Sequence, residues 1–225
     1  MDMLILNRSY VRLDRRGYRF AKRFFDVVVC LLILPLAAIA MAVIAVAILV
    51  DSSGPVIFIQ ERIGRGERRF NMYKFRTMKH NCDDRAGREF MQAFVAGQIN
   101  QDAVADQATY KPRHKNHITR VGRILRKTSL DELPQIFNVL RGEMSLVGPR
   151  PNVPWEVQVY RGWHNERLEV LPGITGLAQV CGRSDIPFDN IVQYDIEYIQ
   201  NQSLELDLKI LWQTALAVVR QNGAG

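Results

Sequence analysis

A run of apolar residues near the N-terminus constrains this chain more than any other feature. Residues 24–50 contain a single charged side chain, Asp26, close to the start of the run. As a helix this segment would extend about 40 Å, whereas the hydrocarbon core of a bilayer is about 30 Å thick. We therefore expect a membrane segment. Pro35 lies inside it, and a proline removes one helical hydrogen bond and clashes with the preceding turn.

The basic residues on either side indicate how this segment meets the membrane. Residues 1–23 hold seven basic side chains and two aspartates, which is most of the formal net charge of +7. Because Lys and Arg concentrate on the cytoplasmic side of membranes, both flanks are predicted to be cytoplasmic. We favour a re-entrant hairpin broken at Pro35 over a single span or a cleaved signal peptide. The basic residues that follow the run are Arg62, Arg65, Arg68 and Arg69.

Composition and pattern predict a mostly helical α+β chain in three parts. Residues 1–23 form a basic juxtamembrane segment that attracts anionic phospholipid. Residues 24–50 form the re-entrant helix-break-helix, and residues 51–225 form a compact cytosolic domain. No interleaving of basic and aromatic residues favours nucleic acid. Cys30, Cys82 and Cys181 are too far apart for a CxxC metal site, and their odd number argues for a reducing compartment.

Periodicity places the secondary structure of the domain. Two strands near 56–60 and 70–77, with a turn at 64–66, form a predicted β-hairpin. Helices are expected near 118–125, 130–140, 155–170, 189–200 and 204–220, with a loop at 172–182. The apolar stripe of the last helix either packs in the core or lies in the membrane interface as an amphipathic helix. Polar residues 85–115 form either an added lid or a surface insertion, and we favour the insertion.

Two adjacent carboxylates, Asp131 and Glu132, interrupt a strongly cationic stretch. One interpretation is structural: Ser129 as N-cap and Glu132 as its capping-box partner. The other is chemical, because a helix N-terminus also binds phosphate. Arg126 and Lys127 lie five and four residues before Asp131 and could contact phosphate oxygens. In that interpretation one carboxylate attacks a phosphoryl group and the other holds a divalent cation. Spacing alone leaves both open.

A series of longer motifs resembles the bacterial sugar transferase family, the monotopic polyprenyl-phosphate phosphoglycosyl transferases of the small single-domain type. The resemblance covers nearly everything from Lys22 onward. The motifs, in chain order, are KRFFD at 22–26, GPVIF at 54–58, ER at 61–62 with Gly64, YKFRTM at 73–78, RKTSLDELPQ at 126–135, NVLRGEMSLVGPRP at 138–151, PGITGLAQVCGR at 172–183, Asp195 with Tyr198, and DLKI at 207–210.

The resemblance implies a transferase that moves a sugar 1-phosphate from a UDP-sugar to a polyprenyl (undecaprenyl) phosphate, releasing UMP and initiating glycan assembly such as exopolysaccharide. It implies that Asp131 is the nucleophile, through a covalent aspartyl-phosphosugar, and that Glu132 is a ligand of Mg²⁺ or Mn²⁺. Arg126 would clamp a phosphate. The other candidate anion-binding residues are Lys74, Arg76, Arg150 and Arg183.

The same resemblance implies a location in the bacterial inner (cytoplasmic) membrane, with the catalytic domain and both termini on the cytoplasmic side; a homodimer is compatible with it. The chain departs from the family in having Leu34-Pro35 where a Ser-Pro pair is usual, about one turn early. Two alternatives stay open. One is a membrane-adherent phosphotransferase or pyrophosphatase acting on a soluble nucleotide, and the other is a non-catalytic basic membrane adaptor.

Overall fold

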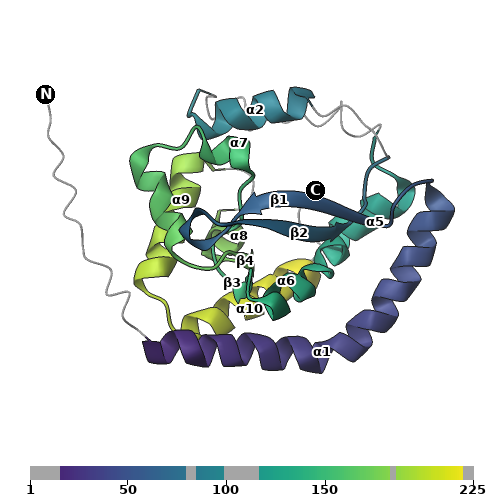
Figure 1. Cartoon of the computed structure of the whole chain (residues 1–225), viewed down its shortest axis with the longest axis horizontal. Coiled ribbons are helices and arrows are strands. Elements are labelled where there is room, and N and C mark those ends of the chain that lie inside the picture. The colour runs from purple at the N-terminus through teal and green to yellow at the C-terminus, as the bar shows by residue number, and fades with distance from the viewer. Residues whose placement is uncertain (1–15, 80–84, 99–116, 183–185, 220–225) are drawn as a thin grey trace, which may run out of the picture.

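The computed structural model describes residues 16–79, 85–98, 117–182 and 186–219. Helices predominate in these parts, accompanied by two small sheets, as predicted for an α+β chain (Figure 1). The elements are α1 (Arg16–Asp51), β1 (Ile57–Ile63), η1 (Arg65–Glu67), β2 (Arg69–Phe75), α2 (Arg85–Val95), α5 (Arg120–Thr128), η2 (Leu130–Glu132), α6 (Gln135–Arg141), β3 (Ser145–Val147), α7 (Pro154–Val157), η3 (Gly162–Glu169), β4 (Gly173–Thr175), α8 (Leu177–Cys181), α9 (Phe188–Gln200) and α10 (Leu204–Val219).

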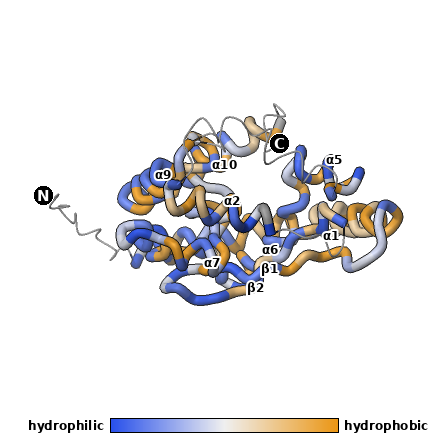
Figure 2. Tube along the Cα trace, turned by 90° about the horizontal axis from the view of Figure 1, so that it is seen from above, coloured by the Kyte–Doolittle hydropathy of each residue, from blue (hydrophilic) through white to orange (hydrophobic). Residues whose placement is uncertain are grey.

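The apolar run forms one continuous helix, α1, that starts before it and ends just after it. Pro35 lies inside this helix, so the predicted break is absent, and Figure 1 shows α1 curving around the domain instead. By length and composition, α1 is the one helix within the described ranges that could cross a membrane. Its inner face buries Cys30, Ala37, Ile44 and Ile48. Its outer face exposes Leu32, Leu36, Ile39, Val43 and Val50. Figure 2 shows the helix coloured largely as hydrophobic where it curves at the right of the view.

A buried carboxylate attaches the N-terminal end of α1 to the C-terminal helices. Asp207 accepts hydrogen bonds from Tyr18 Oη (3.0 Å) and Lys22 Nζ (2.8 Å) of α1 and from Tyr198 Oη (2.7 Å) of α9. The Asp207 side chain is 1% exposed, and a buried charge needs such partners. These three contacts therefore join α1, α9 and α10 at one point.

Two carboxylates of α1 itself, Asp26 and Asp51, attach the rest of the helix to the domain. Asp26 accepts a hydrogen bond from Ser145 Oγ (2.7 Å) in β3. At the opposite end of the helix, Asp51 accepts one from the backbone N–H of Val121 (2.9 Å) in α5. Both ends of α1 are thus attached to the same domain.

The predicted β-hairpin is confirmed. β1 and β2 pair antiparallel from Ile57 with Phe75 to Ile63 with Arg69. The chain reverses through η1, where Gly66 has a φ of 65°, a conformation that suits glycine. Phe70 and Met72 of β2 are buried against α1 and α6 and alternate with exposed residues, as the alternation in the sequence indicates. Phe75, at the end of the strand, belongs to the opposite face and packs with Ile44 and Ile48 near the end of α1.

A second sheet of two short parallel strands, β3 and β4, was not predicted. The predicted loop at 172–182 contains β4 and the short helix α8. Backbones approach closely here: a Cβ on Gly173 would lie 2.1 Å from the backbone nitrogen of Gly148. Glycine at 173 thus allows a pairing with a segment nearly 30 residues earlier, which local periodicity could not indicate.

The predicted helix over 155–170 is wrong. The segment forms the short helix α7 and then the 3₁₀ helix η3. Between them, the N–H of Arg161 donates to Nδ1 of buried His164 (3.2 Å) rather than to a helical carbonyl. Side chains that bond the backbone in this way compete with α-helix. The predicted helices at 118–125, 189–200 and 204–220 are confirmed, with small shifts at their ends.

The first part of the segment at 85–115 is not a simple surface insertion. It forms α2, which lies along the top of the molecule in Figure 1, above α7 and β1. Val95 of α2 is buried and packs with Phe188 and Val192 of α9, so α2 completes a small hydrophobic cluster. Residues 99–116, including His114, lie outside the described residues, as does Cys82.

The Asp207 contacts predict a large effect on stability. Asp207→Ala leaves Lys22 without its buried partner, so we expect the free energy of unfolding to fall by about 3 kcal/mol, measured by equilibrium denaturation with urea. The matched control is Glu205→Ala, an exposed carboxylate in the same helical turn, which should change it by less than about 0.5 kcal/mol. Equal effects of the two substitutions would contradict the anchoring role of Asp207.

Candidate active site

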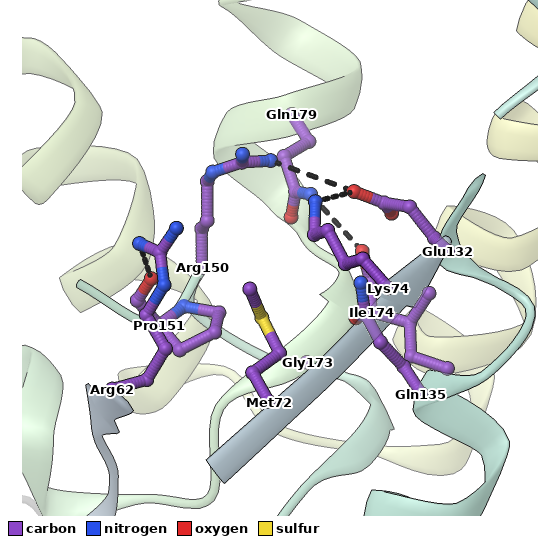
Figure 3. Close-up of a pocket in the computed structure, with 10 residues that line it drawn as sticks. All are labelled: Arg62, Met72, Lys74, Glu132, Gln135, Arg150, Pro151, Gly173, Ile174 and Gln179. Atoms are coloured by element: carbon purple, nitrogen blue, oxygen red, sulfur yellow. Dashed lines mark hydrogen bonds and ion pairs between the residues drawn. The ribbon is translucent and has the colours of Figure 1, made fainter. Parts of the chain in front are cut away.

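A polar pocket forms where β2, η2 and the segment after β3 meet (Figure 3). Lys74 reaches it from β2, Glu132 from η2 and Arg150 from the segment that follows β3. Residues from three separate parts of the chain therefore meet in one place. The pocket is lined by Arg62, Met72, Lys74, Glu132, Gln135, Arg150, Pro151, Gly173, Ile174 and Gln179.

The acidic pair owes its position to a reversal of the chain at Ser129. This residue ends α5 in the left-handed conformation, with a φ of 56°, and its N–H bonds to the Arg126 carbonyl. The next three residues form η2, and Pro134 precedes α6. The predicted capping box is wrong, because the Ser129 side chain caps nothing and the Glu132 carboxylate bonds to Lys74 instead.

Glu132 lies at the centre of a cluster of positively charged side chains in the pocket. Its Oε1 atom lies 2.7 Å from Lys74 Nζ and 4.0 Å from Arg150 Nη1, as Figure 3 shows. Burial opposes ionisation, but Lys74 and Arg150 outweigh it and hold the pKa of Glu132 below its ordinary value. Burial lowers the pKa of Lys74, and Glu132 offsets this only in part. Glu132 is therefore ionised and forms ion pairs with Lys74 and Arg150.

Asp131 has a different environment from its neighbour. Within the described ranges no side chain forms an ion pair with it. Burial raises the pKa of Asp131, and the charges of Lys74 and Arg126 offset only part of that increase. A partly desolvated carboxylate without an ion-pair partner is more nucleophilic than a paired one. The two adjacent carboxylates thus differ in the way that separate chemical roles require.

A buried amide holds the pocket walls together. Asn138 of α6 donates from Nδ2 to the Asn71 carbonyl (2.7 Å), and its Oδ1 accepts from the Tyr73 N–H (3.1 Å). Both partners are backbone groups of β2, on either side of Met72. The side chain is fully buried, so these bonds fix α6 against the strand that carries Lys74.

The other predicted phosphate-binding residues divide into three cases. Arg126 lies beside the pair, and its Nε donates to Thr77 Oγ1 (3.0 Å). Arg76 lies apart from the pocket, buried against the end of α1, where Nη2 donates to the carbonyl oxygen of Ser52 (2.6 Å). Arg183 lies outside the described residues. The structure thus gathers Lys74, Arg150 and Arg126 near the acidic pair and gives Arg76 a contact with α1.

Arg62 and Gln179 are among the pocket residues that were missed in the sequence. Arg62 in β1 donates from Nη1 to the Pro151 carbonyl (2.9 Å), and burial together with the charge of Arg150 lowers its pKa to about 10. Gln179 in α8 donates to the Ile174 carbonyl (3.1 Å). Arg62 stands in the ER motif and Gln179 in the PGITGLAQ motif, but nothing local indicates that either faces Glu132.

The donor set suits a metal that is shared with a phosphate ligand. Among the residues that the structure describes, no group of three or more His, Cys, Asp and Glu side chains could hold a metal alone. Mg²⁺ usually needs only one or two carboxylates, completed by water and substrate phosphates. Glu132 could supply one such ligand, although its Oε1 is held by Lys74. The residues therefore fit Mg²⁺ bound together with a phosphate compound.

Comparison with known proteins extends over almost the whole chain. The chain is 41% identical over 224 residues to the undecaprenyl-phosphate galactose phosphotransferase of Salmonella typhimurium, covering 98% of this chain and 45% of that protein. It is 41% identical over 209 residues to the exopolysaccharide production protein ExoY of Rhizobium meliloti, covering 91% and 88%. It is 40% identical over 204 residues to the undecaprenyl-phosphate glucose phosphotransferase of Komagataeibacter xylinus, covering 86% and 35%.

The chain therefore spans less than half the length of the Salmonella and Komagataeibacter relatives and most of the length of ExoY. The family model described as bacterial sugar transferase matches residues 17–221, which includes α1, both sheets and every described wall of the pocket. The chain belongs to the bacterial sugar transferase family.

Proposed function

We propose that this protein is a phosphoglycosyl transferase that moves a sugar 1-phosphate from a UDP-sugar to undecaprenyl phosphate and so initiates the assembly of a polysaccharide. The observation that carries the proposal is the contrast within the acidic pair: Glu132 forms ion pairs with Lys74 and Arg150, whereas adjacent Asp131 forms none with the described residues. The names of the relatives, which include galactose and glucose phosphotransferases acting on undecaprenyl phosphate, support the substrate class.

In the first step, a carboxylate oxygen of Asp131 attacks the phosphorus next to the sugar. A bond forms between that oxygen and phosphorus, and the bond from phosphorus to the bridging oxygen breaks, so UMP leaves with the electron pair. The diphosphate is anionic, and its repulsion by Asp131 must be offset by positive charge. Lys74 and Arg150 are placed to supply that charge, and Arg126 lies beside the nucleophile.

In the second step, an oxygen of undecaprenyl phosphate attacks the same phosphorus. The bond to Asp131 breaks, the free carboxylate is restored, and the sugar is left on a lipid diphosphate. Covalent catalysis of this kind divides one difficult transfer into two easier ones. The Lys74, Arg150 and Arg126 cations can serve both steps, because each step passes through a similarly charged phosphoryl group.

We further propose that Glu132 holds Mg²⁺ or Mn²⁺ once the UDP-sugar is bound. The metal would neutralise charge on the diphosphate oxygens. Lys74 then competes with the metal for the same carboxylate oxygen, since it already occupies Oε1 at 2.7 Å. Before the substrate binds, the Lys74 ammonium takes the place that a metal would otherwise fill.

We propose that α1 enters one leaflet of the membrane and returns, with both ends on the cytoplasmic side. Both ends are attached to one polar domain, through Asp207 at the start and Asp51 at the end. A spanning helix would place these attachments on opposite sides of the bilayer. The large apolar side chains on the outer face of α1 have no protein cover in the described structure, and lipid suits them.

The nucleophile is tested by Asp131→Asn, which keeps the side-chain volume but removes the charge. With UDP-galactose, UDP-N-acetylgalactosamine and UDP-glucose as donors, we expect UMP release and transfer into extractable lipid to fall at least about 1,000-fold. The wild type should show a phosphosugar adduct on Asp131 by mass spectrometry. The control is Arg123→Gln, an exposed residue of α5.

Full UMP release by Asp131→Asn would refute the proposed mechanism. Release of UMP by the wild type without a lipid product would favour a pyrophosphatase or another phosphotransferase. No turnover with any donor, together with binding to an acidic partner, would favour a membrane adaptor.

Competition at Glu132 is tested by Lys74→Met in the absence of a UDP-sugar. Removing the ammonium frees Oε1, so we expect the affinity for Mn²⁺ at pH 8 to rise about tenfold, measured from the electron paramagnetic resonance signal of free Mn²⁺. Glu132→Gln should abolish this binding. The matched control is Arg69→Met, because Arg69 is an exposed cation of the same strand, paired with Glu61. Unchanged or weaker binding by Lys74→Met would show that Lys74 and the metal do not compete.

The topology is tested by single cysteines at both ends of α1, in a background without the native cysteines. The two substitutions are Gly17→Cys, which has open space around its Cβ position, and Ser53→Cys, at an exposed residue. We expect a membrane-impermeant maleimide to label both only after the inner membrane is permeabilised. A spin label at Leu36→Cys should lie within the hydrocarbon. Labelling of either end in sealed spheroplasts of a Gram-negative host would show a spanning helix.

A further inference from the structure

Four consecutive backbone carbonyls, from residue 149 to residue 152, each accept a hydrogen bond from another part of the chain. This segment carries Arg150, and Pro149 and Pro151, which flank Arg150, restrict its backbone further. The donors, in the order of the carbonyls, are Gly173 N (2.9 Å), Arg167 Nη2 (3.3 Å), Arg62 Nη1 (2.9 Å) and Ile63 N (2.8 Å). The backbone at Arg150 is therefore held from β1, β4 and η3 at once.

Arg167 differs from the other three donors. Its side chain is almost fully buried, and Nη2 lies 2.5 Å from Oδ2 of Asp195 in α9, which is equally buried. Nη1 donates to Tyr160 Oη (3.1 Å). Burial raises the pKa of Asp195 to about 6, and the carboxylate of Asp195 raises the pKa of Arg167 although burial opposes it. The pair is thus ionic at neutral pH.

A buried ion pair is costly, because both charges lose their water. Apolar side chains of similar size would often give equal or greater stability, so stability alone does not account for this pair. Arg167 does not line the pocket. It contacts residues 149–152 through the hydrogen bond to the carbonyl of Arg150, whose guanidinium lies 4.0 Å from Glu132.

We propose that the Arg167–Asp195 ion pair is a positioning device that fixes the backbone of Arg150, so that its guanidinium meets the diphosphate of the UDP-sugar. Asp195 orients the guanidinium of Arg167, and Arg167 holds the carbonyl of Arg150. The inference rests on the proposed function, in which Arg150 binds the diphosphate. It assigns a positioning role to two residues that do not line the pocket, Arg167 and Asp195, of which Asp195 belongs to a family motif.

The test is the double variant Arg167→Met/Asp195→Leu. Replacing both charges with apolar side chains avoids leaving one of them unpaired, so we expect Tm to stay within a few degrees of the wild type. The carbonyl of Arg150 loses its donor, so KM for the UDP-sugar should rise about tenfold while kcat changes little, as for lost ground-state binding. An unchanged KM in a stable double variant overturns the proposal.

A cycle with Arg150→Ala separates positioning from a general structural role. If the pair acts through Arg150, the double variant adds less than about twofold to KM once Arg150 is gone. Independent, additive effects overturn the proposal. Should the double variant unfold, Arg167→Lys replaces it, because lysine keeps the charge beside Asp195 but cannot form two directed bonds in the same way. The same rise in KM and the same non-additivity are expected.

Hydrogen exchange supplies a readout that does not depend on the reaction. In the double variant we expect faster exchange of the backbone amides of Ile63, Val153 and Gly173, whose hydrogen bonds hold residues 149–153, with unchanged exchange in α5. Unchanged exchange at these three amides overturns the proposal. Faster exchange there, combined with an Arg150→Ala variant that binds the UDP-sugar normally, supports the positioning and refutes the role of Arg150 in the proposed function instead.

Discussion

The attachment of a long apolar helix to a polar domain through buried carboxylates is the constraint on which the rest of this structure depends. Asp207 and Asp26 are both buried, and each accepts hydrogen bonds that join elements far apart in the sequence. α1 is consequently part of the fold rather than an appended anchor. Its inner face supplies Cys30 and Ala37 to the cluster that also contains Met72 and Val139. Without α1 this cluster would be open to water.

The same core holds the elements that line the pocket in place. Lys74 stands on β2, whose inward side chains pack against α1, and Asn138 fixes the backbone of β2 to α6. Only Leu133 and Pro134 separate η2 from α6, so the acidic pair lies close to the start of that helix. Arg150 is held by contacts from β1, β4 and η3. Because β1 also pairs with β2, the hairpin joins the two walls that carry Lys74 and Arg150.

Much of the fold could be predicted from the sequence, for reasons that differ between elements. The hairpin was predictable because its alternation and its glycine turn are local signals. The helix over 155–170 was not, since a side chain of buried His164 takes up the N–H of Arg161 and ends the helical pattern. The residue types of the acidic pair indicated the candidate site. The alternative interpretation, a capping box of Ser129 and Glu132, was wrong because Ser129 adopts a left-handed conformation. Arg62 was missed because its partner, Pro151, lies 89 residues away.

The double attachment of α1 has a geometric consequence for the reaction. Hydrogen bonds through Asp207 and Asp51 attach both ends of α1 to the domain and so fix the orientation of the domain relative to the helix. If α1 lies in the membrane as proposed, its depth there sets the distance of Asp131 from the surface of the bilayer. A lipid phosphate is confined to a thin plane, and a soluble nucleotide is not. At a fixed distance from the membrane, Asp131 would meet the soluble substrate in the plane where the phosphate of the lipid substrate diffuses.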